Sequence, residues 1–282
     1  MMKKKPVVLS VLAHPDDESF GMGGTLALYA ERGAEVHLVC ATRGEVGEMD
    51  EKYMQGFDSI AARRESELRC AAGILDLTGV HFLDYRDSGM PGSVDNEHPR
   101  ALFAQPLEEV AENIVCYIRD LKPDVVLTFD PIGGYRHPDH IAIHDATVMA
   151  FERADDASFA PQSGAPFKPE KLYFHTFSRA FLRVTVRVMR LFGQDPTKFG
   201  KNKDIDIESL AKVDFPIHAR INIRSVLKKK EAAGRCHASQ GGGQMQKGVR
   251  GILSRLFNGT EMYMQAWPPV EGKFKVRHDL LG

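Results

Sequence analysis

Long hydrophobic runs and an excess of charge of either sign are both missing from this 282-residue sequence. No window of about 18 consecutive apolar residues occurs, so we expect no membrane-spanning helix. Lys and Arg total 37, and Asp and Glu total 38, which leaves a net charge of -1. Nucleic-acid binding needs a concentrated basic surface. The charge balance therefore argues against a nucleic-acid partner.

Cysteine is also scarce. Four cysteines lie far apart without CxxC spacing: Cys40, Cys70, Cys116 and Cys236. Such isolated cysteines predict reduced, mostly buried thiols in a cytoplasmic protein. The basic stretch Lys3–Lys5 precedes a short apolar run and resembles the start of a signal peptide, but a charged cluster follows that run at once. We therefore expect no leader and a cytoplasmic location.

A glycine-rich nucleotide loop is the third absence. Gly21, Gly23 and Gly24 follow the first apolar run, but they lack the last spacing of the GxGxxG fingerprint. A non-catalytic nucleotide- or sugar-binding Rossmann module remains the alternative from another class of function. That alternative gives no reason for the histidines His137 and His140, which lie far down the chain.

The first apolar run, Val7–Ala13, ends abruptly in one histidine and three carboxylates, HPDDE. A near-continuous, valine-rich run predicts a buried strand of a parallel sheet. Charged groups after such a strand usually lie at the carboxyl edge of the sheet, where α/β proteins bind ligands. Asp16 or Asp17 could instead cap the next helix. The combination of His14 with two nearby aspartates favours a metal or catalytic site.

A second buried-strand run, Val125–Asp130, leads into PIGGYRHPDH and so to His137, Asp139 and His140. Two strand ends, each followed by an HPD triplet, predict one shared site. Zinc in hydrolytic enzymes typically takes three protein ligands, often two His and one carboxylate, with water in the fourth position. The cluster supplies such a set and leaves groups for a general base and for an oxyanion. His144, one turn beyond His140, is expected behind the site or at the surface.

Together, AHPDDE near the amino terminus and GGYRHPDH in the middle of the chain resemble the PIG-L/LmbE-type zinc-dependent deacetylases. Three further segments fit this family: RESEL at 64–68, RDSGM at 86–90 and HASQ at 237–240. The resemblance implies hydrolytic removal of an acetyl or related acyl group from the amine of a glucosamine-containing conjugate. The implied cofactor is Zn2+, with Fe2+ as the alternative. The implied partner is a small-molecule amino-sugar conjugate, and an amidase of a thiol-sugar conjugate is the alternative within the family.

The same resemblance implies roles for individual residues. The implied metal ligands are His14, Asp17 and His140. The implied catalytic groups are Asp16, as general base, and His137, as acid or oxyanion stabiliser. The implied substrate contacts are Arg64 and Asp87, with Tyr135 near the scissile carbonyl, and Asp139 supports the site without binding the metal. Arg136 departs from the glycine common in the family, and His237 is expected at the pocket rim.

The order of elements predicts an α/β fold: a single Rossmann-like domain with a mostly parallel sheet and helices on both faces. We expect one domain over residues 1–282, with a core of about 6–240 and a C-terminal extension of about 241–282. Strands are expected at 7–13, 35–41, 80–83, 125–130, 171–177 and 219–223, and helices at 60–75, 107–121, 140–153 and 225–237.

Residues 179–192 fit both helical and strand periodicity. We favour a basic amphipathic helix that covers the edge of the core over a helix that binds a membrane or an anionic substrate. A homo-oligomer is compatible with the sequence.

Overall fold

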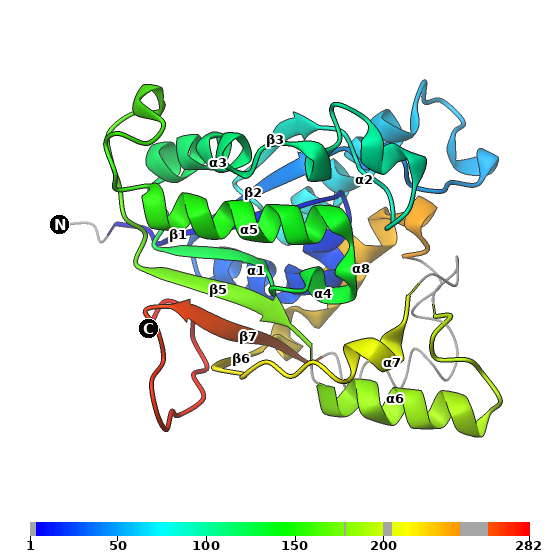
Figure 1. Cartoon of the computed structure of the whole chain (residues 1–282). Helices are drawn as coiled ribbons and strands as arrows, with labels where there is room; N and C mark the ends of the chain where they lie inside the picture. The colour runs from blue at the N-terminus through cyan, green and yellow to red at the C-terminus, as the bar shows by residue number, and fades with distance from the viewer. Residues whose placement is uncertain (1–3, 178, 200–204, 243–258) are drawn as a thin grey trace.

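A computed structural model describes residues 4–177, 179–199, 205–242 and 259–282 (Figure 1). Its centre is a seven-stranded sheet with the order β3-β2-β1-β4-β5-β7-β6. The strands are β1 Val7–Leu12, β2 Glu35–Thr42, β3 Gly79–Tyr85, β4 Val125–Phe129, β5 Lys171–Thr176, β6 Ala219–Asn222 and β7 Thr260–Trp267. Strands β1 to β5 run parallel, whereas β7 runs antiparallel to both β5 and β6. The expected α/β fold with a mostly parallel sheet is confirmed.

Helices cover both faces of the sheet. They are α1 Gly23–Glu31, α2 Ile60–Leu75, α3 Leu107–Leu121, α4 Gly133–Arg136, α5 Pro138–Arg153, α6 Arg179–Leu191, α7 Ile207–Leu210 and α8 Leu227–Cys236. Helices α3 and α5 pack together on the face nearest the viewer in Figure 1, and α1, α2 and α8 pack together on the other face. Within the described ranges, none of these helices combines the length and the apolar character needed to cross a membrane.

Local sequence explains where these elements begin and end. Every residue of β1 and β4 is buried, as expected for strands covered on both faces. Helix α2 begins after Ser59, whose hydroxyl accepts a hydrogen bond from the N–H of Ala62 at 3.1 Å. Helix α3 ends where Lys122 adopts a left-handed φ of 51°, and Pro123 then prevents the helix from continuing.

The connections reverse direction at β1, and this reversal locates the site. The chain builds β2 and β3 on one side of β1 and then crosses to place β4 on the other side. Ser10 of β1 accordingly pairs with Leu38 of β2 and with Leu127 of β4. Ligands of open α/β sheets bind beyond the carboxyl ends of the strands at such a reversal. The two HPD segments follow the carboxyl ends of β1 and β4, on the two sides of this reversal.

Two regions differ from or refine the sequence prediction. Residues 260–267, which were expected to lie in a C-terminal extension, form strand β7 between β5 and β6. The boundary predicted near residue 240 therefore does not coincide with the edge of the sheet, and residues 243–258 of the expected extension lie outside the described ranges. The helical interpretation of 179–192 is confirmed by α6, whose Val186 packs against Ile207 and Leu210 of α7.

The prediction of four reduced thiols is wrong for two cysteines. Cys70 of α2 and Cys236, the last residue of α8, form a disulfide across a sequence separation of 166 residues. Their side chains meet because α2 and α8 pack side by side on the same face of the sheet. Cys40 and Cys116 are free thiols, the first buried and the second partly buried.

Candidate metal centre

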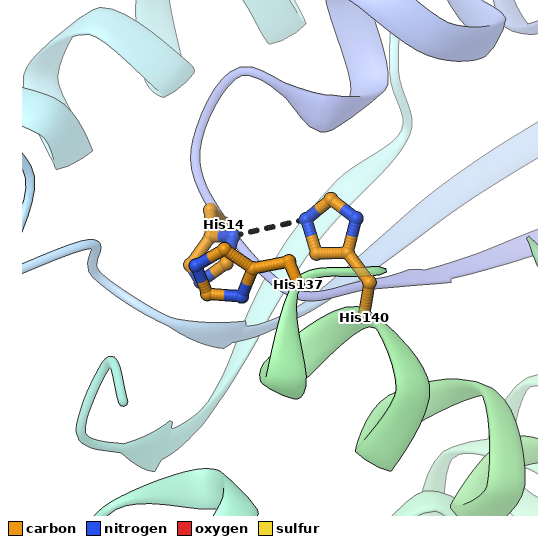
Figure 2. Close-up of side chains that lie close together, drawn as sticks. All are labelled: His14, His137 and His140. Atoms are coloured by element: carbon orange, nitrogen blue, oxygen red, sulfur yellow. Dashed lines mark hydrogen bonds between the residues drawn. The ribbon is translucent and has the colours of Figure 1, made fainter. Parts of the chain in front are cut away.

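The two HPD segments meet beyond β1 and β4, where their histidines lie close together (Figure 2). The ring centroids of His14 and His137 are 4.6 Å apart, and those of His137 and His140 are 5.1 Å apart. All three side chains are buried. His14 Nδ1 and His140 Nε2, joined by the dashed line in Figure 2, are 3.2 Å apart. These imidazoles form a group that could hold a metal ion.

A glycine turn brings His140 to this position. Gly133 and Gly134 have φ angles of 60° and 68°, a conformation that favours glycine. A Cβ atom on Gly133 would lie only 2.7 Å from the Cβ of His140. His140 Nδ1 is 3.1 Å from the carbonyl oxygen of Gly133, which cannot donate, so Nδ1 carries the proton. The lone pair of His140 Nε2 is therefore directed at the centre.

Asp17 adds a carboxylate to the same point. Its Oδ1 is 3.3 Å from His140 Nε2, and its Oδ2 is 3.7 Å from His14 Nδ1. Ligands about 2.0–2.1 Å from a tetrahedral zinc lie about 3.3 Å from one another. The distance between His140 and Asp17 Oδ1 matches this spacing, as does the 3.2 Å between His14 Nδ1 and His140 Nε2, whereas the 3.7 Å contact to His14 is made by the other Asp17 oxygen. Burial opposes ionisation of Asp17, but its interactions with His140 and His14 outweigh burial and lower its pKa below the usual value.

The other nitrogen of His14 faces two more carboxylates. His14 Nε2 is 3.0 Å from Asp139 Oδ2 and 3.6 Å from Asp87 Oδ1. The backbone N–H of Ser88 donates to the same Asp139 oxygen at 2.9 Å. A carboxylate behind a metal-binding histidine fixes its tautomer and orientation. This geometry leaves His14 Nδ1 as the metal-facing atom, although His14, Asp87 and Asp139 form a second group with suitable spacing.

Asp16 lies beside these donors and contacts Arg64. Burial raises the pKa of Asp16 to about 6, and the charge of Arg64 is the strongest effect opposing it. Arg64 Nη2 donates to Asp16 Oδ2 at 3.1 Å and to the carbonyl oxygen of Pro15 at 2.7 Å, while Nη1 donates to the carbonyl oxygen of Gly44 at 3.1 Å. Arg64 is buried, and these contacts direct it at Asp16 and its loop.

Glu18 and His237 form a buried pair that sequence patterns do not indicate. Their side chains have no exposed surface, and His237 Nε2 lies 2.7 Å from Glu18 Oε1. The other Glu18 oxygen accepts the backbone N–H of Asp16 at 3.0 Å. His237 is therefore buried beneath the loop that carries Asp16 and does not lie at the pocket rim, so that expectation is wrong. The HASQ motif drew attention to His237, but Glu18, its partner, lies 219 positions away in the sequence.

His137 and Tyr135 also lie beside His140. His137 Nδ1 accepts the backbone N–H of Asp139 at 3.2 Å and thereby caps α5. Burial, together with His14 and His140, lowers the pKa of His137 to about 2. The Tyr135 ring is 4.9 Å from that of His140, and burial raises the pKa of its hydroxyl.

Three further residues make contacts around the site. Arg86 pairs with Asp95 at 2.8 Å. Glu45 is half-buried, and it accepts the backbone N–H of Asp87 at 3.1 Å. His144 is buried behind the site, where its Nδ1 lies 2.8 Å from the carbonyl oxygen of Phe129.

Comparisons with known proteins identify the family of this chain. The PIG-L family, described as GlcNAc-PI de-N-acetylase, matches residues 9–151. The 1D-myo-inositol 2-acetamido-2-deoxy-alpha-D-glucopyranoside deacetylase of Geodermatophilus obscurus is 35% identical over 242 residues, which cover 83% of this chain and 82% of the relative. The conserved protein TT1542 from Thermus thermophilus superposes with a TM-score of 0.61 at 23% identity and covers 94% of this chain and 96% of its own. GalB, the 4-carboxy-2-hydroxymuconate hydratase of Pseudomonas putida KT2440, has a TM-score of 0.60 at 21% identity, with 96% and 100% covered.

The chain belongs to the PIG-L family, and the predicted family is confirmed. The expected enzyme class, a deacetylase, agrees with the name of the curated relative. The two solved structures show the fold alone. Since one of them is a hydratase, the sheet and helices do not define the reaction, and function has to be inferred from the site.

Proposed function

We propose that this protein is a zinc-dependent hydrolase that removes the acetyl group from the amine of a glucosamine-containing conjugate. The observation that most supports this proposal is the position of Asp16 next to a buried group in which His14 Nδ1 and His140 Nε2 lie 3.2 Å apart and Asp17 Oδ1 lies 3.3 Å from His140. The name of the 35% identical relative supports a glucosamine-inositol substrate. An amidase of a thiol-sugar conjugate remains the alternative within the family.

The metal would be held by His14 Nδ1, His140 Nε2 and the Asp17 carboxylate. Two imidazoles and one carboxylate suit zinc, and Fe2+ can use the same donors. When bound, zinc supplies Lewis-acid chemistry: it acidifies a water molecule and polarises the acyl carbonyl. The neutral tautomers inferred for both histidines leave a lone pair toward the ion.

Asp16 is the general base in this proposal. A pKa of about 6 leaves most of the carboxylate ionised at neutral pH and still able to accept a proton. Asp16 takes the proton from the attacking water and later returns it to the departing amine. Arg64 and Glu18 hold this residue from two sides.

His137 has the better geometry for the oxyanion. Because its Nδ1 accepts the N–H of Asp139, the neutral ring carries its proton on Nε2. That N–H can donate a hydrogen bond to the developing oxyanion. A pKa lowered to about 2 means that the ring is neutral at working pH, which disfavours the role of acid. Of the two roles implied by the resemblance, we therefore favour oxyanion stabilisation.

Contacts to the sugar by Arg64, Asp87 and Tyr135 remain predictions, as do a cytoplasmic location and a homo-oligomer. The single domain expected over residues 1–282 also remains a prediction, and the insertion of β7 between β5 and β6 supports it.

Metal content and acetate release test the proposal directly. Purified protein should contain about one zinc per chain and release acetate from N-acetylglucosamine α-linked to inositol. Asp16→Asn should retain zinc and lose activity by about 10²–10⁴-fold. Asp17→Asn, the matched control one residue away, should lose zinc first. The reverse pattern, or near-wild-type turnover by Asp16→Asn, would refute the assignment.

A further inference from the structure

The backbone of Asp16 has an unusual conformation. Its φ angle is 128°, in a region that side-chain-bearing residues rarely adopt. Such a conformation is strained and persists only where surrounding contacts hold it. The N–H of Asp16 donates to Glu18 Oε2 at 3.0 Å. Glu18 is therefore one of the contacts that hold this backbone.

Glu18 is itself held by His237. Both side chains are fully buried, and His237 Nε2 contacts Glu18 Oε1 at 2.7 Å. The hydroxyl of Ser19 donates to the same oxygen at 2.6 Å. His237 Nδ1, in contrast, has no hydrogen-bond partner among the described residues. The polar interaction of His237 is thus directed at Glu18 through one defined atom.

The position of His237 is fixed from α2. Ser239 donates its N–H and its hydroxyl to the two carboxylate oxygens of Glu67, at 3.0 and 2.7 Å. On the other side of His237, Cys236 forms a disulfide with Cys70, which lies in α2 as Glu67 does. His237 is therefore held between two attachments to α2 and presents its ring to Glu18.

We propose that His237 and Glu18 are positioning residues: His237 fixes the carboxylate of Glu18, and Glu18 holds the backbone of Asp16 so that the Asp16 side chain faces the reaction centre. This inference rests on the proposed function, in which Asp16 is the base. It assigns a role in catalysis to a residue far along the chain, whose hydrogen bond goes to Glu18 and whose effect on Asp16 is otherwise electrostatic.

Only one of the two ring nitrogens of His237, Nε2, contacts Glu18, and this difference provides a matched pair of variants. His237→Gln places an amide N–H near the position of Nε2 and keeps a donor for Glu18. His237→Asn places its amide near the position of Nδ1, which has no partner among the described residues, and leaves Glu18 without this donor. Gln and Asn differ by only one methylene group, so the two variants share most of any loss of packing around position 237. Their difference isolates the contact to Glu18. Glu18→Asp, which withdraws the carboxylate from Asp16, tests the same contact from the other partner.

We expect His237→Asn and Glu18→Asp to lower kcat by about 10–100-fold, as for a base that is slightly misplaced, and His237→Gln to stay within about threefold of wild type. KM should change by less than about twofold, and zinc content should not change. Hydrogen exchange of the Asp16 amide, measured by NMR on the zinc-loaded protein, should accelerate at least about tenfold in His237→Asn and remain slow in His237→Gln.

Equal kcat and equal Asp16 exchange in the two His237 variants would overturn the proposal, as would a loss of zinc in His237→Asn. Failure of the proposed function is a separate result: wild-type protein would then release no acetate. The exchange of the Asp16 amide does not depend on any substrate, so it decides the positioning role in that case as well.

Discussion

Arg64 distinguishes two interpretations of the centre. The family resemblance implies that it contacts the sugar, which predicts a higher KM when it is removed. In the structure it is buried, and its Nη2 lies 3.1 Å from Asp16 Oδ2. We expect Arg64→Met, which keeps the length of the side chain and removes its charge, to change the pKa of Asp16 more than the affinity for substrate.

The expected magnitude follows from that pKa. Burial raises the pKa of Asp16 to about 6 against the opposing charge of Arg64. An adjacent arginine lowers the pKa of a carboxyl group by about 1–3. Without Arg64 the pKa should therefore rise to about 7–9. Asp16 acts as a base only when ionised, so at pH 7 the ionised fraction falls from about nine-tenths to between about one-half and one-hundredth. We expect kcat/KM at pH 7 to fall by about 2–100-fold and to recover as the pH rises through the new pKa.

The assay is the pH dependence of kcat/KM, with zinc content measured at each pH. Arg69→Met is the control on the same helix, because Arg69 is exposed and pairs with Glu65 at the surface. Its profile should match wild type. An acidic limb that stays in place for Arg64→Met, combined with a raised KM at every pH, would refute this reasoning and support a direct sugar contact.

Two further predictions concern stability. Glu261→Ala should lower the free energy of unfolding by about 3 kcal/mol or more, because it leaves Lys230 and two N–H groups at the start of α1 without their buried partner. Urea unfolding with the exposed Glu271→Ala as control measures this, and a loss below about 1 kcal/mol would contradict it. Cys70→Ser should cost about 2–4 kcal/mol, since the disulfide closes a loop of 166 residues, whereas Cys116→Ser should have little effect. Alkylation of all four cysteines in unreduced, denatured protein would show that the disulfide is not formed.

Regular patterns made much of the fold predictable. The buried runs that became β1 and β4 indicated a parallel sheet, and the apolar periodicity of 107–121 with Pro123 beyond it indicated α3 at its observed ends. Two strand ends with HPD triplets were enough to predict one shared site, because carboxyl ends of adjacent parallel strands meet at one edge. These are local signals, or signals that depend only on the topology of the sheet.

Strand β7 escaped prediction for a physical reason. Its buried positions include Glu261 and Gln265, while Met262 and Met264 on the alternate face are only partly buried. In an ordinary half-buried strand the apolar side chains are buried and the polar ones are exposed. In β7, polar side chains occupy buried positions and apolar ones lie on the more exposed face. Glu261 is satisfied by the N–H groups of Gly24 and Thr25, about 237 positions away. The pair of Glu18 and His237 is hidden in the same way, since neither sequence neighbourhood indicates the other.

The charge balance around His14 explains why these donors lie together. The carboxylates of Asp17, Asp87 and Asp139 lie 3.7, 3.6 and 3.0 Å from its ring nitrogens. Burial disfavours a charged His14, but Asp87 and Asp139 outweigh burial and raise the pKa of His14 well above its usual value. These carboxylates thus favour a protonated His14. In the proposed function, a divalent cation would supply that positive charge and would be held by the neutral imidazole through Nδ1. The sequence predicts the donors, but the surplus of buried carboxylate around one imidazole arises only from the fold, and this surplus favours a cation at the proposed centre.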